Sequence, residues 1–210
     1  SYKKNYIING NFDIWQRGTG TFTANNQYSA DRFIQLVDTS TMSTTHALFT
    51  LGQTDVPNNP TSYLSSTVVT GSTASSLALL AQKIEGVQTL AGETVTLSFW
   101  AKATTASKSI GIEFGQYFGA GGSPSAQVTG TGELINLTTS WAKYTVTYAV
   151  PSISSKAIGT NGSDNLYVFF WLDGGSTFNT RTGSLGNQSG TFNIAQIQLE
   201  EGTVATDFEY

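Results

Sequence analysis

The chain has 210 residues, with 10 Lys and Arg against 14 Asp and Glu, a net charge of -4, one His and no Cys. The basic residues are too few and too scattered to form the positive stripe that follows a nucleic-acid backbone. We therefore expect no nucleic-acid partner. The lack of Cys excludes disulfides and Cys-ligated metals, and a single His excludes a His-based metal cluster. No apolar run reaches about 18 residues, so we expect no insertion into a membrane.

Short stretches with alternating apolar residues follow one another along the chain and predict β-strands. In chain order they are 6–18 with an Asn-Gly turn, 28–37, two or three strands within 39–76, 77–84, 94–103, 110–117, 134–137, 141–150, 166–172 and 191–200. Residues 77–84 fit either a strand or one helical turn, and 84–103 are interpreted as a central hairpin. A slip in the alternation between Ile194 and Ile197 predicts a bulge in the last strand.

The turns between these stretches are rich in Gly and Asn, and no segment longer than about a dozen residues has helical periodicity. This pattern predicts an all-β fold of two antiparallel sheets packed face to face, a β-sandwich or jelly roll. The length suits one well-buried core, and we find no internal repeat or linker. Residues 1–210 are therefore expected to form a single domain.

Trp100 is the anomaly that suggests a function. It alternates with Val95, Leu97, Phe99 and Ala101 and so lies, with Lys102, on the face that should meet water. The same reasoning turns Tyr167, Phe169 and Trp171 away from the core side of 166–172. On 110–117 it leaves Glu113 and Tyr117 outside.

We expect these three strands to share a sheet, whose outer face then carries a group of aromatic rings. A sugar offers an apolar C–H face and a rim of hydroxyls, which flat rings and nearby polar groups can bind. Trp100 and Trp171 would stack, and the others would form a polar rim. The candidate ligand-binding residues are Trp100, Glu113, Tyr117, Tyr167, Trp171, Asp173 and Arg181.

Two other interpretations of this face remain open, because large apolar patches often mark contacts. It could be covered by the N-terminal segment or a long loop of its own chain, or by another subunit. Catalysis has weaker support: His46 stands alone, and no Gly-x-Ser-x-Gly elbow occurs. Glu113 and Asp173 are the carboxylates to test as a glycosidase pair, although surface or turn positions explain them better, and we expect no enzyme.

Several motifs resemble those of a domain found in bacteriophage tail and tail-fibre proteins. They are residues 8–18 (INGNFDIWQRG), 30–33 (ADRF), 195–202 (AQIQLEEG) and 205–210 (ATDFEY). Residues 92–103 and 141–150 are similar to jelly-roll carbohydrate-binding modules. The resemblance spans nearly the whole chain.

This resemblance implies a virion domain near a fibre tip that attaches to a host cell-surface polysaccharide, commonly as a homotrimer. Related modules often hold a structural calcium between an acidic residue after the first strand and an aspartate in the last. Asp13 matches the first position, but Ala195 and Gln196 stand where the second would fall. We therefore expect no metal site and no cofactor.

The leading hypothesis is thus a non-catalytic receptor-binding domain of a phage tail fibre. One alternative is a structural trimerisation or assembly domain whose aromatic face, with Trp171, is the subunit interface. Another is an accessory glycan-binding module of a polysaccharide-degrading enzyme.

Overall fold

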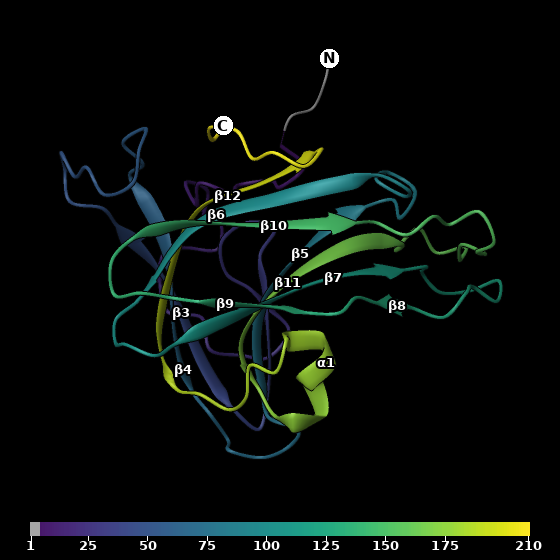
Figure 1. The fold of residues 1–210 in the computed structure, drawn as a ribbon. Coiled ribbons are helices and arrows are strands. Elements are labelled where there is room, and N and C mark those ends of the chain that lie inside the picture. The colour runs from purple at the N-terminus through teal and green to yellow at the C-terminus, as the bar shows by residue number, and fades with distance from the viewer. Residues whose placement is uncertain (1–4) are drawn as a thin grey trace.

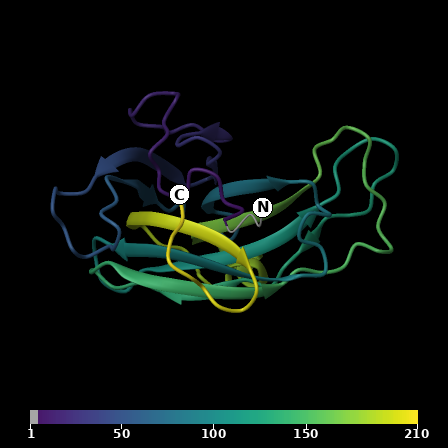
Figure 2. The same ribbon diagram turned by 90° about the horizontal axis from the view of Figure 1, so that it is seen from above.

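The computed structural model describes residues 5–210, which form two antiparallel β-sheets packed face to face (Figures 1 and 2). The seven-stranded sheet has the order β1 (Gln27–Tyr28), β2 (Ile34–Asp38), β5 (Leu77–Glu85), β11 (Asn165–Gly174), β7 (Ser109–Tyr117), β8 (Val128–Thr129), and β9 (Glu133–Asn136) also pairs with β7. The five-stranded sheet has the order β10 (Ala142–Ala149), β6 (Thr94–Ala103), β12 (Gly190–Glu201), β4 (Ser62–Val69), β3 (Thr41–Leu48). The predicted all-β sandwich is confirmed.

The core lies between the sheets and is built from one alternating set of side chains in each strand. Val95, Leu97 and Phe99 of β6 face it, as predicted. Phe99 meets Phe170 of β11 edge-on, with 5.3 Å between the ring centroids. Because these positions are fixed by the core, the residues between them must lie on the outer faces of the two sheets.

Two predicted elements are wrong. Residues 6–18 form turns and irregular chain rather than a strand, since Asn9 and Phe12 both have positive φ, which a strand does not allow. Residues 84–103 do not form a hairpin either, because β5 and β6 belong to different sheets. The link between them therefore crosses from one layer to the other.

The bulge predicted in the last strand is present. The pairing of β12 with β6 shifts between Ala195 and Gln198, and Gln196 has a positive φ of 47°. Residues 77–84 belong to the strand β5, so the helical alternative is excluded.

Helical structure in the described chain is confined to one short segment, a 3-10 turn η1 (Ser176–Phe178) followed by α1 (Asn179–Thr182). Within residues 5–210 no helix has the length and apolar character needed to cross a bilayer. The segment matters because it packs on the outer face of the seven-stranded sheet, next to β7 and β11 (Figure 1).

Candidate functional site

The outer face of the seven-stranded sheet is organised around β11, which lies between β5 and β7. Register sets Tyr167 beside Lys83 on one side and Gly115 on the other. Phe169 follows two residues later and is paired with Glu113. The prediction that Tyr167, Phe169 and Glu113 lie on the side away from the core is confirmed, since none of the three belongs to the inter-sheet core.

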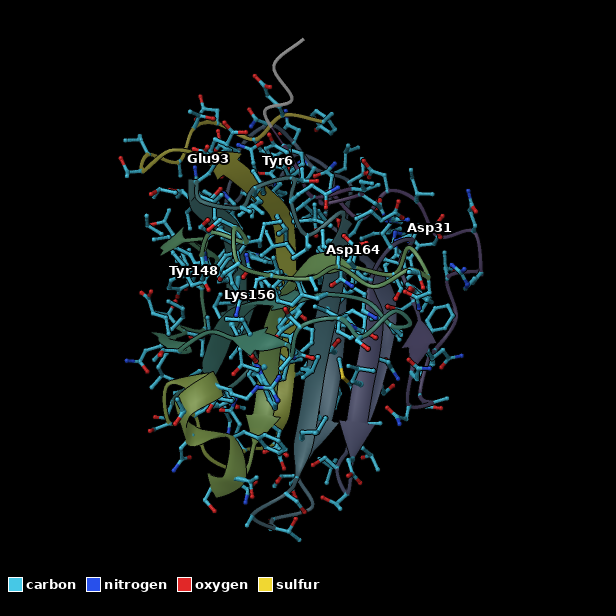
Figure 3. The ribbon with its side chains drawn as sticks, turned by 90° about the vertical axis from the view of Figure 1, so that its right-hand side faces the viewer. Tyr6, Asp31, Glu93, Tyr148, Lys156 and Asp164 are labelled. Carbon is cyan, nitrogen blue, oxygen red and sulfur yellow. The ribbon has the colours of Figure 1, made fainter. Side chains whose placement is uncertain are left out.

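A cleft of about 580 Å³ lies over this face. The segment that carries Asp164 (Figure 3) forms part of its border. Its lining combines aromatic rings with amide and charged groups: Tyr28, Arg32, Ile34, Leu36, Lys83, Glu85, Tyr117, Gln127, Gly162, Ser163, Asp164, Asn165, Tyr167 and Phe169.

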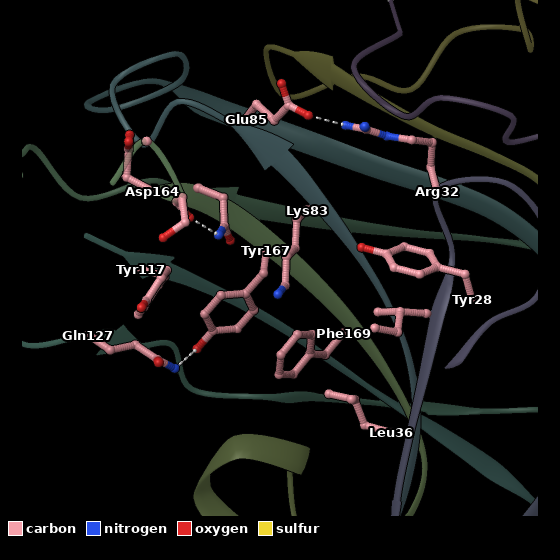
Figure 4. A pocket seen from close by; sticks show the side chains of 14 residues that line it. Tyr28, Arg32, Leu36, Lys83, Glu85, Tyr117, Gln127, Asp164, Tyr167 and Phe169 are labelled. Atoms are coloured by element: carbon pink, nitrogen blue, oxygen red, sulfur yellow. Dashed lines mark hydrogen bonds and ion pairs between the residues drawn. The ribbon is translucent and has the colours of Figure 1, made fainter. Parts of the chain in front are cut away.

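The charged residues of the cleft differ in how they are engaged. Arg32 and Glu85 form an ion pair of 2.9 Å, and Asp164 accepts a hydrogen bond of 2.8 Å from the backbone of Val87. Lys83 lies beside the rings of Tyr167 and Phe169 (Figure 4), and no carboxylate among residues 5–210 pairs with it. Its ammonium group is therefore a free hydrogen-bond donor in the middle of the cleft.

The ring of Tyr167 lies over Gly115, and the glycine is what allows this. A Cβ atom at position 115 would come within 2.0 Å of both Cζ and the hydroxyl oxygen of Tyr167. Tyr167 also stacks on Phe169, with 4.2 Å between the centroids, and its hydroxyl accepts a hydrogen bond of 2.9 Å from Gln127. The floor of the cleft is thus a fixed aromatic surface.

Beneath this floor the carboxylate of Glu113 is fully buried and joins three side chains. It accepts hydrogen bonds from the Tyr167 hydroxyl (3.2 Å), the Trp171 indole N–H (2.8 Å) and Arg181 Nε (2.9 Å). Burial raises the pKa of Glu113, and the hydrogen bond and positive charge of Arg181 offset part of that rise. Burial and the nearby Glu113 charge also raise the pKa of Tyr167 well above its usual value.

Trp171 lies on the predicted face, but it is not accessible there, with only 1% of its surface exposed. Phe178 packs against its ring at 5.1 Å, and the guanidinium of Arg181 lies 5.2 Å from the ring centroid. Trp171 and Phe178 belong, with Leu79 of β5 and Leu185, to a small second apolar cluster. Of the open interpretations, cover by a long loop of the same chain therefore holds for Trp171, and its predicted exposure is wrong.

Asp173 also lies away from the cleft. It is fully buried and accepts hydrogen bonds from Ser40 Oγ (2.6 Å) and the backbone N–H of Gln188 (2.8 Å). Asp173 therefore has a structural role, because these hydrogen bonds join β11 to two neighbouring segments. Since neither Asp173 nor Glu113 lines the cleft, the two do not face each other across a space that could hold a glycosidic bond.

Trp100 and Lys102 do not share a sheet with the other candidates, which corrects the expected single platform. Their strand, β6, lies in the five-stranded sheet, so both project from the opposite side of the sandwich. Trp100 there borders a small hollow of about 100 Å³ that also contains Gln196 and Phe208. The error has a physical origin, since strand pairing between distant segments cannot be read from alternation within one strand.

The structure thus brings Glu113, Tyr117, Tyr167, Trp171 and Arg181 to one face, and only Tyr117 and Tyr167 line the cleft itself. Most of the other residues that line the cleft were not identified from the sequence: Tyr28, Arg32, Lys83, Glu85, Gln127 and Asp164. Alternation in 77–84 could have placed Lys83 on the outer face, but nothing local indicates that the loops with Gln127 and Asp164 meet it.

Asp13, the position matched to a calcium ligand, accepts hydrogen bonds from Asn11 Nδ2 (2.8 Å) and Thr61 Oγ1 (3.1 Å). In the described part of the chain, no three His, Cys, Asp or Glu side chains lie close enough together to hold a metal ion.

Comparison with known proteins gives the class of fold. No family model and no curated protein matches the sequence. Among solved structures, the chain is similar to the N-terminal cellulose-binding domain of β-1,4-glucanase C from Cellulomonas fimi, at 17% identity and a TM-score of 0.51, covering 95% of this chain and 98% of that one.

A sugar-binding protein described as putative, from Bacteroides thetaiotaomicron, matches at 16% identity and a TM-score of 0.50, with 95% and 100% coverage. The enzymatically active domain of bacteriophage CBA120 tailspike protein 4 matches at 14% identity and a TM-score of 0.46, covering 94% of this chain and 21% of that one. At such identities the first two likenesses establish the fold alone: the jelly-roll sandwich of carbohydrate-binding modules.

Proposed function

We propose that this domain binds a glycan, without catalysing a reaction on it, in the cleft on the outer face of the seven-stranded sheet. The observation that carries the proposal is the lining of that cleft, where aromatic rings lie beside amides, hydroxyls and a free ammonium group. Its volume of about 580 Å³ suits a small ligand or a few sugar units. Glu113 and Asp173, the carboxylates considered for hydrolysis, do not line the cleft. Glu85 and Asp164, which do, are engaged by Arg32 and by the Val87 backbone, which favours binding over hydrolysis.

The residues of the cleft divide into two roles. Phe169 and Tyr28, both partly exposed, would stack on the C–H faces of sugar rings. Lys83, Tyr117 and Gln127 would hydrogen-bond the hydroxyls. Trp171, Glu113 and Arg181, expected from the sequence to touch the ligand, would instead hold the floor and one wall in place.

We further propose that the domain belongs to a phage tail fibre, displayed on the virion as a trimer that attaches to a host cell-surface polysaccharide. The support is the resemblance of residues 8–18, 30–33, 195–202 and 205–210 to phage tail proteins. Three copies on one fibre would raise the apparent affinity of weak single contacts by roughly a hundredfold or more.

A second candidate is an accessory module of a polysaccharide-degrading enzyme, which the likeness to a glucanase cellulose-binding domain favours. It would use the same cleft and differ only in its neighbours. The assembly hypothesis loses support on this face, because its own chain already covers Trp171.

The test is binding of the purified domain to polysaccharide from candidate bacterial hosts and to soluble cellulose, xylan and mixed-linkage glucan, by calorimetry and affinity electrophoresis. Phe169→Ala is expected to weaken binding by roughly tenfold, since it removes the central stacking ring. Tyr210→Ala, at a residue that is 80% exposed and outside the cleft, is the matched control. Equal affinities for wild type and Phe169→Ala would reject this cleft as the site.

A further inference from the structure

A second group of aromatic side chains lies on the outer face of the five-stranded sheet. Phe49, just after β3, Tyr63 of β4 and Trp141, just before β10, are in mutual contact. Their ring centroids are 4.8 Å apart for Phe49 and Tyr63, 5.1 Å for Phe49 and Trp141, and 5.3 Å for Tyr63 and Trp141. We call these three residues the second aromatic cluster.

The fold itself does not account for this cluster. None of its three members belongs to either buried apolar group, and each remains partly exposed. Segments that are distant in the sequence converge here, whereas an isolated surface aromatic would need no explanation. Gathered rings that the core does not use point to a ligand or a partner.

Lys102 of β6 adds a polar group to the cluster. Its Nζ lies 5.3 Å from the centroid of the Trp141 ring, and it forms no ion pair with any carboxylate of residues 5–210. The arrangement of a flat indole beside an ammonium with free N–H groups matches what a sugar needs: stacking on one side and hydroxyl recognition at the edge.

Beside the cluster is a hollow of about 460 Å³ that shares the wall formed by Phe49. Thr50, Asn59 and Thr61 provide hydroxyl and amide groups in its lining. The volume falls in the range of small-ligand sites. Leu48 and Leu51, which are 67% and 101% exposed, also line it and would suit a protein contact, so the test must include self-association.

We propose that the second aromatic cluster, with Lys102 and this hollow, is a second glycan-binding surface. Trp141 and Tyr63 stack on sugar rings, and Lys102 donates to hydroxyls. The surface lies on the opposite side of the sandwich from the first cleft (Figures 1 and 2), so the two cannot be parts of one binding groove. A single domain can then hold two glycan chains, and this surface does not depend on the first cleft being a site.

The four tryptophans of the chain report on four separate places, which makes an NMR titration decisive. Trp141 belongs to the second aromatic cluster, and Trp171 is buried on the outer face of the seven-stranded sheet. Trp100 borders the hollow near Phe208, and Trp15 is in the core. Cello-, xylo- and mixed-linkage oligosaccharides and a delipidated bacterial surface polysaccharide are the probes. The expected result is a saturable shift of the Trp141 indole N–H signal, while that of Trp15 stays fixed.

Trp141→Ala is expected to weaken binding at this surface by about tenfold and leave binding in the first cleft unchanged. Lys102→Met, which keeps the length of the stem and loses the donor, checks the result with little risk to folding. Phe169→Ala is the reciprocal control: its failure to act would reject the first cleft and leave this surface standing. No Trp141 shift with any probe, or self-association in sedimentation that Trp141→Ala abolishes, would overturn the proposal.

Discussion

The outer faces of the two sheets both carry aromatic residues, but they hold them in different ways. On the seven-stranded sheet a buried carboxylate, Glu113, anchors the rings, and the α1 segment covers Trp171. On the five-stranded sheet no buried carboxylate among residues 5–210 is bonded to the rings. Phe49, Tyr63 and Trp141 contact one another there, and Lys102 lies beside Trp141. An outward-facing aromatic residue can therefore be a packed part of the structure on one sheet and remain accessible to a ligand on the other.

The largest expected difference concerns the two tryptophans. Trp171→Ala is expected to lower the free energy of unfolding by about 3–5 kcal/mol, because it opens a cavity and frees a buried carboxylate oxygen. Trp141→Ala, at a partly exposed site, is expected to cost about 1 kcal/mol. Urea denaturation measures both, and equal losses would contradict the distinction between the faces.

Removal of the anchor is the next test. Glu113→Ala leaves Arg181, Trp171 and Tyr167 without their shared acceptor, and a loss of about 3 kcal/mol is expected. The control is Glu85→Ala, which breaks an ion pair whose side chains are 39% and 80% exposed, and which should cost less than about 1 kcal/mol. If the two variants unfold at the same urea concentration, Glu113 does not anchor the rings of this face.

A smaller effect is expected from Gly115→Ala. The added Cβ would force the Tyr167 ring off β7, at a cost of about 1–3 kcal/mol, and should weaken glycan binding in the first cleft. Gly190→Ala on β12 is a suitable control, because its Cβ would meet only the flexible side chain of Lys108, at 3.3 Å. Calorimetric titration and thermal melting of both variants check this, and full glycan affinity in Gly115→Ala would show that the ring position is unimportant.

The smallest expected effect is a dependence of stability on pH. Burial raises the pKa of folded Glu113 above its ordinary value of 4.5. The folded protein therefore binds this proton more tightly than the unfolded chain, so the contribution is fully present below pH 4.5 and is lost as pH rises through the folded-state pKa. Glu113→Gln cannot titrate. The wild type should lose stability relative to this variant over that range, and parallel unfolding curves at every pH would contradict it.

The sequence was sufficient for the fold class and for the side that faces the core in the strands 94–103, 110–117 and 166–172. Alternation correctly turned Val168 and Phe170 inward and Tyr167 and Trp171 outward, because burial of one face of a sheet fixes the pattern. It could not show that Phe178 returns to cover Trp171, since residues 176–190 have the composition of an ordinary loop.

The second aromatic cluster was beyond sequence reasoning for a similar reason. In the structure Trp141 precedes its strand, Phe49 follows one, and Tyr63 alone of the three lies within a strand. Their meeting depends on the order of β10, β6, β12 and β4 in the sheet, which involves contacts between segments far apart in the chain. Trp100 was placed on the wrong sheet for the same reason.

The hydrogen bonds around Glu113 have one more consequence. Gln127, on the long loop before β8, donates to Tyr167; Tyr167 donates to Glu113; and Arg181 of α1 reaches the same carboxylate. The loop with Gln127, which lines the cleft, and the α1 segment, which does not, are therefore mechanically linked through a single buried group. Anyone who exchanges the Gln127 loop to redirect the domain to another sugar would have to keep its bond to Tyr167, or the packing of the α1 segment would change as well.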